Sequence, residues 1–132
     1  MSIVVDSSVI VAALIDGGPH GEWAEDVLAG SSLQAPELVQ VEATNVFRRL
    51  ERAKLITAPE ANAAQDDLMQ LAIELFPFEP FAGRVWQLRH NVTSYDAWYI
   101  AIAEALKLSL ATLDEPLAKT KGVTCKFLTP GF

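Results

Sequence analysis

Three acidic residues follow predicted strands or open predicted helices, where a folded chain could use them for chemistry: Asp6, Asp96 and Asp114. Asp6 ends an apolar, β-branched run at residues 2–6, a pattern that predicts a buried strand followed by a helix. Asp114 follows a second buried strand, predicted at residues 108–112, and Asp96 lies in the first turn of a helix predicted at residues 93–106. Because functional groups collect beyond the carboxyl ends of parallel strands, we expect these acids to lie near one edge of a sheet.

A fourth acid, Glu42, lies inside a helix predicted at residues 37–52. Leu38 and Val39 precede it by one turn and Val46 follows it by one turn, so its side chain lies on or beside an apolar stripe. An ionised carboxylate is costly to bury there unless another group pairs with it. Glu42 is therefore either an acid at the margin of the stripe or a member of a buried polar site.

The first three acids also have ordinary structural explanations. Asp6 and Asp114 are suited to cap the helices that follow them, and Asp96 stands three residues after Thr93, where it complements the helix dipole or closes a capping box. For any one of these acids alone, such a role is the better explanation. Three acids at strand ends or helix starts together indicate a shared site.

A shared site of carboxylates predicts bound cations. Carboxylates that lie close together repel, and some take up protons unless cations lie between them. Oxygen-only ligand sets suit Mg²⁺ or Mn²⁺, which activate water and stabilise the oxygens of a phosphodiester during hydrolysis. The acids therefore predict metal-assisted phosphodiester hydrolysis without a side-chain nucleophile.

Short apolar strands alternate with helices along the chain. Besides the elements above, we predict helices at residues 9–15, 20–28, 57–74, 81–90 and 114–119, and strands at 33–35, 75–80 and 123–127. The proline-rich stretch at 75–80 fits only an edge strand. This alternation predicts a single α/β domain, residues 1–132, with a central, mostly parallel sheet in a three-layer α/β/α arrangement.

Composition and charge limit the classes of protein that fit. Apolar residues make up 51% of the chain and charged residues 20%, which argues against disorder. The longest apolar run, residues 9–15, is too short to span a bilayer, and the lone Cys125 cannot form an intrachain disulfide. We expect a cytoplasmic protein with no membrane segment. The net charge of −7 argues against nucleic acid as a partner, but cations held by the acids would reverse the local field.

The chain resembles a PIN domain, and in particular the VapC-type toxin ribonucleases of bacterial toxin–antitoxin pairs. The resemblance extends over the whole length and rests on four stretches in the family's order: Val-Asp-Ser-Ser-Val at 5–9, Glu-Ala-Thr-Asn at 42–45, Ser-Tyr-Asp-Ala-Trp-Tyr-Ile-Ala at 94–101 and Leu-Ala-Thr-Leu-Asp at 110–114. The third stretch is the most specific. Any one match would be weak, but four matches in order are strong.

The resemblance implies roles for individual residues. Asp6, Glu42, Asp96 and Asp114 match the acidic quartet that coordinates Mg²⁺, with Mn²⁺ as a substitute, and supports RNA cleavage. Ser8 and Thr112 match hydroxyls that bond the ligating carboxylates, and Asn45 faces the same way as Glu42 and could orient substrate or water. Local capping and backbone hydrogen bonds explain these three polar residues equally well.

The resemblance also implies partners. They are an RNA substrate, a second copy in a homodimer and a VapB-type antitoxin whose basic or aromatic segment blocks the acidic cleft. Some relatives have a further acid shortly after the fourth aspartate, where this chain has Pro116 and Leu117. This departure leaves open whether one or two ions bind.

Basic and aromatic residues elsewhere have less specific interpretations. A cluster near the end of the 37–52 helix, and two lysines near the site, could follow an RNA backbone, although a solvated surface explains any one of them better: Arg48, Arg49, Arg52, Lys54, Lys119 and Lys121. Trp98, Tyr95 and Tyr99 are expected in the core or an interface rather than as platforms for RNA bases.

Two other functions fit the sequence less well. An inactive PIN-like module that only binds RNA or protein would fit the fold, but the presence of all four acids argues against it. An aspartyl phosphatase would need a second acid two residues after Asp6, where Ser8 stands.

Overall fold

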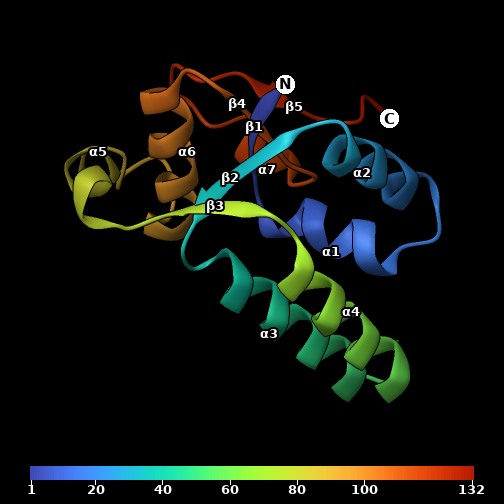
Figure 1. Cartoon of the computed structure of the whole chain (residues 1–132). Coiled ribbons are helices and arrows are strands. Elements are labelled where there is room, and N and C mark those ends of the chain that lie inside the picture. Colours follow the sequence, from blue (N-terminus) through green and yellow to red (C-terminus); the bar gives the residue numbers. More distant parts are fainter.

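Strands and helices alternate along the chain in the computed structural model, which describes residues 1–132 (Figure 1). The elements in chain order are β1 (Ser2–Val5), α1 (Ser7–Ile15), α2 (Pro19–Ala29), β2 (Ser32–Pro36), α3 (Val39–Arg52), α4 (Ala58–Gln70), β3 (Ile73–Phe76), the 3₁₀ turn η1 (Glu79–Phe81), α5 (Ala82–Gln87), α6 (Ser94–Leu106), β4 (Ser109–Ala111), α7 (Glu115–Ala118) and β5 (Phe127–Leu128). None of the helices combines the length and the apolar character that crossing a bilayer would require.

The five strands form one sheet in the order β3-β2-β1-β4-β5, and every neighbouring pair is parallel. The central strand β1 contributes Ile3, Val4 and Val5, which are fully buried, as its continuous apolar run predicts. The prediction of an α/β domain with a mostly parallel sheet is confirmed. Since all strands run the same way, the carboxyl ends of β1, β2 and β4 lie at one edge.

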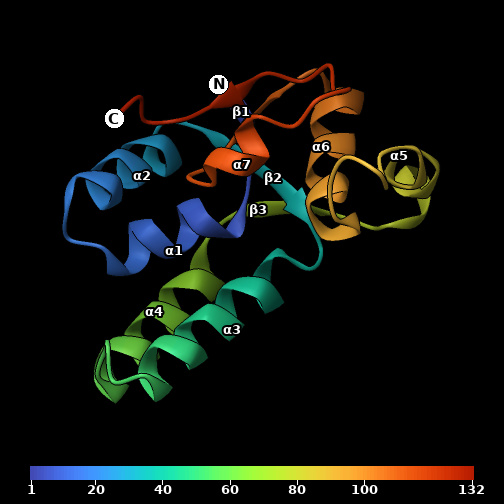
Figure 2. The same ribbon diagram turned by 180° about the vertical axis from the view of Figure 1, so that it is seen from behind.

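Helices cover both faces of the sheet. α6 packs on β1, β2 and β4, while α1 and α2 pack on each other on the other side of the sheet (Figures 1 and 2). α3 and α4 pack together as a hairpin that extends away from the sheet in both views. The three-layer arrangement places α1, α3 and α6 around the edge where β1 ends.

Side-chain caps start the helices where the sequence predicts them. Asp6 caps α1 by accepting a hydrogen bond from the Val9 N–H. Thr57 and Glu60 form a reciprocal capping box at the start of α4. These local bonds fix where each helix begins and thus where its first turn points.

Several predicted boundaries are wrong. The edge strand predicted at 75–80 lies at Ile73–Phe76, and the 3₁₀ turn Glu79–Phe81 follows it. The helix predicted at 57–74 ends at Gln70, because Ile73 to Phe76 pair with β2 as a parallel edge strand, and this pairing overrides the local helical pattern. The last strand is only Phe127–Leu128 instead of residues 123–127. The preceding loop is held by side chains: Arg84 Nη2 donates to the Gly122 carbonyl at 2.9 Å and Asn91 Nδ2 to the Lys121 carbonyl at 2.7 Å.

Candidate functional site

Asp6 stands at the carboxyl end of the central strand, and only 6% of its surface is exposed. Its Oδ1 accepts hydrogen bonds from the Ser8 hydroxyl at 2.5 Å and from the Val9 N–H at 3.2 Å. Its Oδ2 accepts a hydrogen bond from the Thr112 hydroxyl. The carboxylate therefore caps α1, as predicted, and two hydroxyls also fix its orientation.

The same two hydroxyls join Asp6 to the loop that follows β4. Ser8 Oγ accepts a hydrogen bond from the Leu113 N–H at 3.0 Å, and Thr112 Oγ1 accepts one from the Asp114 N–H at 2.9 Å. Ser8 and Thr112 thus bond the carboxylate of Asp6 and also bond the backbone. The predicted contact with Asp6 and the predicted backbone bonding are therefore both present. Any part they play in supporting a metal remains a prediction.

The surroundings of the Asp6 carboxyl disfavour its ionised form. Burial raises its pKa from 3.8 to about 6, although the bonds from Ser8, Thr112 and Val9 lower it, and the charge of Asp96 raises it further. At neutral pH the group is therefore mostly ionised, in a place where ionisation is disfavoured. A cation beside it would offset that cost.

Glu42 lies half-buried in α3, and its partner is Tyr99 of α6. The Tyr99 hydroxyl donates a hydrogen bond to Glu42 Oε1 at 2.5 Å. Burial raises the pKa of Glu42, the bond from Tyr99 lowers it, and the charge of Asp96 raises it. Burial and the charge of Glu42 raise the pKa of Tyr99, so the phenol keeps its proton and acts as the donor.

Tyr99 is the functional contact that sequence reasoning missed. Its ring is buried, as predicted, but its hydroxyl belongs to the acidic site. The sequence does contain one indication of this contact. Tyr99 lies three residues after Asp96, so both residues lie on the same face of α6. Only the approach of α3 shows which acid it meets.

Asp96 and Asp114 complete the group of acids. Thr93 caps α6 by accepting a hydrogen bond from the Asp96 N–H at 3.2 Å, while the Asp96 carboxylate lies half-buried in the first turn. Burial and the charge of Asp114 raise the pKa of Asp96, and the Thr93 hydroxyl lowers it. Asp114 is exposed and caps α7 by accepting a hydrogen bond from the Leu117 N–H at 3.1 Å.

Asp96 lies within electrostatic reach of each of the other three acids. The charge of Asp96 raises the pKa of Asp6 and the pKa of Glu42, and the charge of Asp114 raises the pKa of Asp96. No lysine or arginine forms an ion pair with any of them, since the only ion pair of the structure joins Arg84 to Glu104. The acids share one region, but no three of them converge closely enough to form a ready-made set of metal ligands. Mutual repulsion favours this separation.

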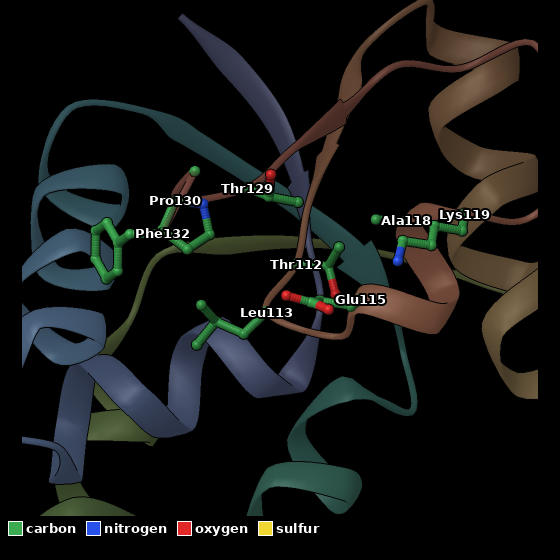
Figure 3. A pocket seen from close by; sticks show the side chains of 9 residues that line it. Thr112, Leu113, Glu115, Ala118, Lys119, Thr129, Pro130 and Phe132 are labelled. Carbon is green, nitrogen blue, oxygen red and sulfur yellow. The ribbon is translucent and has the colours of Figure 1, made fainter.

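The other candidate residues lie outside this group of acids. The Asn45 side chain is exposed, and its oxygen accepts a hydrogen bond from Arg48 at 3.5 Å rather than contacting any of the four acids. Glu115, next to Asp114, lines a separate pocket (Figure 3). Leu117 is buried in the core. No further acid from the segment after Asp114 therefore joins the four.

Comparison with known proteins identifies the family. Residues 3–123 match the family model described as PIN domain. Ribonuclease VapC1 of Mycobacterium tuberculosis is 38% identical over 124 residues, which are 93% of this chain and 93% of VapC1.

Solved structures share the fold. The crystal structure of VapC20 from Mycobacterium tuberculosis, described as a sarcin-ricin loop cleaving toxin, has a TM-score of 0.68 at 18% identity and covers 93% of this chain and 97% of its own. VapBC-5 from the same organism, described as a member of the VapBC family of toxin–antitoxin systems, has a TM-score of 0.55 at 19% identity and covers 97% of this chain and 96% of its own. With a PIN match over most of its length and a VapC ribonuclease aligned almost from end to end, this chain belongs to the PIN-domain family and, within it, to the VapC ribonucleases.

Proposed function

We propose that this protein is a Mg²⁺-dependent endoribonuclease and the toxin of a toxin–antitoxin pair. The observation that supports this most is the position of Asp96 within electrostatic reach of Asp6, Glu42 and Asp114, with no basic side chain paired to any of them. Unpaired carboxylates at one edge of a sheet favour bound cations, and the same cations would attract the phosphates of RNA. The identity with VapC1, which is named a ribonuclease, supports RNA as the substrate.

The donor set suits a hard divalent cation. All four side chains offer carboxylate oxygens only, and Mg²⁺ is usually held by one or two carboxylates together with waters. Asp6 and Asp96 would hold the ion, with Glu42 and Asp114 completing the set. A bound ion of this kind lowers the pKa of water and stabilises charge on phosphate oxygens, and Mn²⁺ would substitute for it.

The surrounding residues would keep the carboxylates oriented. The hydroxyls of Ser8 and Thr112 fix both oxygens of Asp6, so this carboxylate is directed before any ion arrives. Tyr99 does the same for Glu42 and, since it keeps its proton, it can only donate to that carboxylate. Reorientation of ligands on binding would therefore be small for two of the four acids.

An apolar groove beside the site is suited to an antitoxin segment. It has a volume of about 510 Å³, runs between α1 and α3, and is lined by Val11, Ile15, Val46 and Leu50, with Ser8 at its margin. An amphipathic helix of a VapB-type antitoxin could lay its apolar face here. An arginine at the end of that helix would then reach Asp6 and replace the cation.

A homodimer is the second proposed assembly. The side chains of Trp86 and Tyr95 are exposed, and large aromatic side chains are enriched at protein interfaces. We expect both rings to become protected from solvent in the dimer.

An RNA cleavage assay on the purified protein tests the proposed activity. We expect cleavage with Mg²⁺ or Mn²⁺, none in EDTA, and recovery when excess Mg²⁺ is added. Asp6→Asn and Asp96→Asn should each cleave at least about 100-fold more slowly with an unchanged circular dichroism spectrum. Asp26→Asn, an exposed acid on α2, is the matched control and should cleave normally. Full cleavage by the Asp6→Asn/Asp96→Asn double variant would contradict the site.

A further inference from the structure

A second cavity lies at the same edge of the sheet as the acids. It is formed by the loop after β4, by α7 and by the segment after β5, residues 129–132 (Figure 3). Its volume is about 360 Å³, within the range of roughly 300–1,000 Å³ typical of small-molecule sites. None of the four acids lines it. Thr112 connects the two places, because it lines the cavity while its hydroxyl bonds Asp6.

Two opposite charges line this cavity without pairing. Glu115 lies at the start of α7 and Lys119 four residues later, a spacing and order that favour an ion pair on a helix. No ion pair forms between them, since the only one in the structure joins Arg84 to Glu104. Figure 3 shows both side chains among those that line the cavity. The cavity therefore offers one free ammonium group and one free carboxylate.

The remaining walls are apolar or carry a hydroxyl. Leu113 and Pro130 provide apolar surface, and Thr129 provides a hydroxyl (Figure 3). The Phe132 ring stacks on His20 of α2, with ring centroids 5.2 Å apart and planes 10° from parallel. This stacking connects Phe132, which lines the cavity, to α2.

We propose that this cavity is a subsite for one unpaired nucleotide of the RNA strand, with Lys119 on its phosphate and Glu115 on its base. The proposal rests on the ribonuclease activity proposed above. A strand whose phosphate lies at the acids would reach this cavity by continuing along the same edge of the sheet, because Thr112 connects the two places. Single-stranded RNA is recognised by splayed bases that contact apolar walls and bond through their edges, and lysine binds phosphate as a point charge.

The carboxylate of Glu115 gives this subsite a preference among bases. An ionised carboxylate can only accept hydrogen bonds. Adenine, cytosine and guanine each present an exocyclic amino donor, whereas uracil presents a single N–H between two carbonyl oxygens that repel a carboxylate. The subsite therefore favours an amino-bearing base and disfavours uracil.

Binding of mononucleotides to the metal-free protein tests the subsite without any cleavage. Amide chemical shifts in EDTA should change at Leu113, Lys119 and Thr129 when CMP, AMP or GMP is added, with UMP binding at least about fivefold more weakly. Lys119→Met should weaken CMP binding about tenfold. Lys107→Met, a lysine that precedes β4 and so lies at the opposite edge of the sheet, should not. Shifts absent for all four nucleotides, or equal for UMP and CMP, would overturn the subsite.

Cleavage of a random RNA pool tests the same subsite on a strand. Sequenced fragment ends from the wild-type protein should show uracil depleted at one fixed position from the cut. Glu115→Gln should abolish that depletion, because an amide also donates, while Glu51→Gln at the exposed end of α3 should retain it. If the protein cleaves RNA and Glu115→Gln shows the same uracil depletion as the wild-type protein, the subsite is overturned while the proposed ribonuclease activity stands. Nucleotide binding as described without RNA cleavage supports the subsite and contradicts the proposed activity.

Discussion

Replacing Asp6 with asparagine should stabilise the metal-free protein, even though Asp6 lies in the proposed metal site. Burial raises the pKa of this carboxyl from 3.8 to about 6, so above pH 6 the folded protein holds a charge that unfolding releases into water. The difference of roughly two pKa units corresponds to a penalty of about 3 kcal/mol on the free energy of unfolding.

The asparagine side chain removes the charge and keeps most of the bonds. Its oxygen can still accept from the Ser8 hydroxyl and the Val9 N–H, which bond Asp6 Oδ1 in the wild-type protein. The Thr112 hydroxyl loses its acceptor, at a cost of about 1 kcal/mol. The net gain is therefore about 2 kcal/mol, or about 6 °C in Tm for a domain of this size.

The gain should depend on pH in a defined window. Between pH 3.8 and about 6 the folded protein keeps a proton on Asp6 that the unfolded chain has lost. The contribution of Asp6 to the free energy of unfolding of the wild-type protein therefore falls as pH rises through that window. The higher free energy of unfolding of Asp6→Asn appears in the same window and stays constant above it. Below the window the advantage is gone, since the carboxyl is neutral in both states.

Urea denaturation in EDTA, followed by tryptophan fluorescence at pH 4 and pH 8, measures this difference. Asp26→Asn, an exposed acid on α2, is the control and should match the wild-type protein within about 0.5 kcal/mol at both pH values. If Asp6→Asn is less stable than the wild-type protein at pH 8, or differs from it equally at both pH values, the burial argument for Asp6 is wrong.

Three more substitutions test the contacts around the site and the loop beside it. Thr112→Val removes a hydroxyl that lowers the pKa of Asp6, so the acid limb of the pH–rate profile for RNA cleavage should move to higher pH; an unmoved limb would contradict this role. Tyr99→Phe leaves Glu42 half-buried without its donor, so Mn²⁺ affinity measured by calorimetry should fall about tenfold with an unchanged circular dichroism spectrum, and unaltered affinity would exclude Glu42 from the site. Arg84→Met removes the bonds to Glu104 and Gly122 and should lower the free energy of unfolding in urea by about 1 kcal/mol at neutral pH. Because Arg84 lowers the pKa of Glu104, this contribution is lost as pH falls through that lowered pKa, and a loss of stability that is equal at every pH would contradict it.

The fold class follows from local patterns that the structure preserves. The apolar run of β1 predicts a central buried strand, and the alternation of strands with helices predicts a parallel sheet. Both predictions succeed because the spacing of apolar residues within each element shows which of its faces is buried. The helix starts at Asp6, Thr57 and Thr93 are predictable for the same reason, since a cap bonds residues only two or three positions away.

Contacts between distant segments are not visible in such patterns. Tyr99 meets Glu42 across 57 positions, and Thr112 meets Asp6 across 106, so both bonds depend on how α3, α6 and β4 pack. The predicted end of the helix that begins after Thr57 is wrong for a related reason. Ile73 pairs with β2, and a local helical pattern does not reveal this partner. The pocket beside α7 likewise depends on where the segment after β5 lies.

Titration of the metal-free protein with Mn²⁺ by calorimetry tests the metal site most directly. We predict saturable binding by the wild-type protein and by Asp26→Asn, and its loss in Asp96→Asn, because Asp96 is the acid within electrostatic reach of all the others. Absence of binding by the wild-type protein at millimolar Mn²⁺ would contradict the metal site and favour an inactive module that binds RNA or protein. Unchanged binding by Asp96→Asn would place the ion elsewhere.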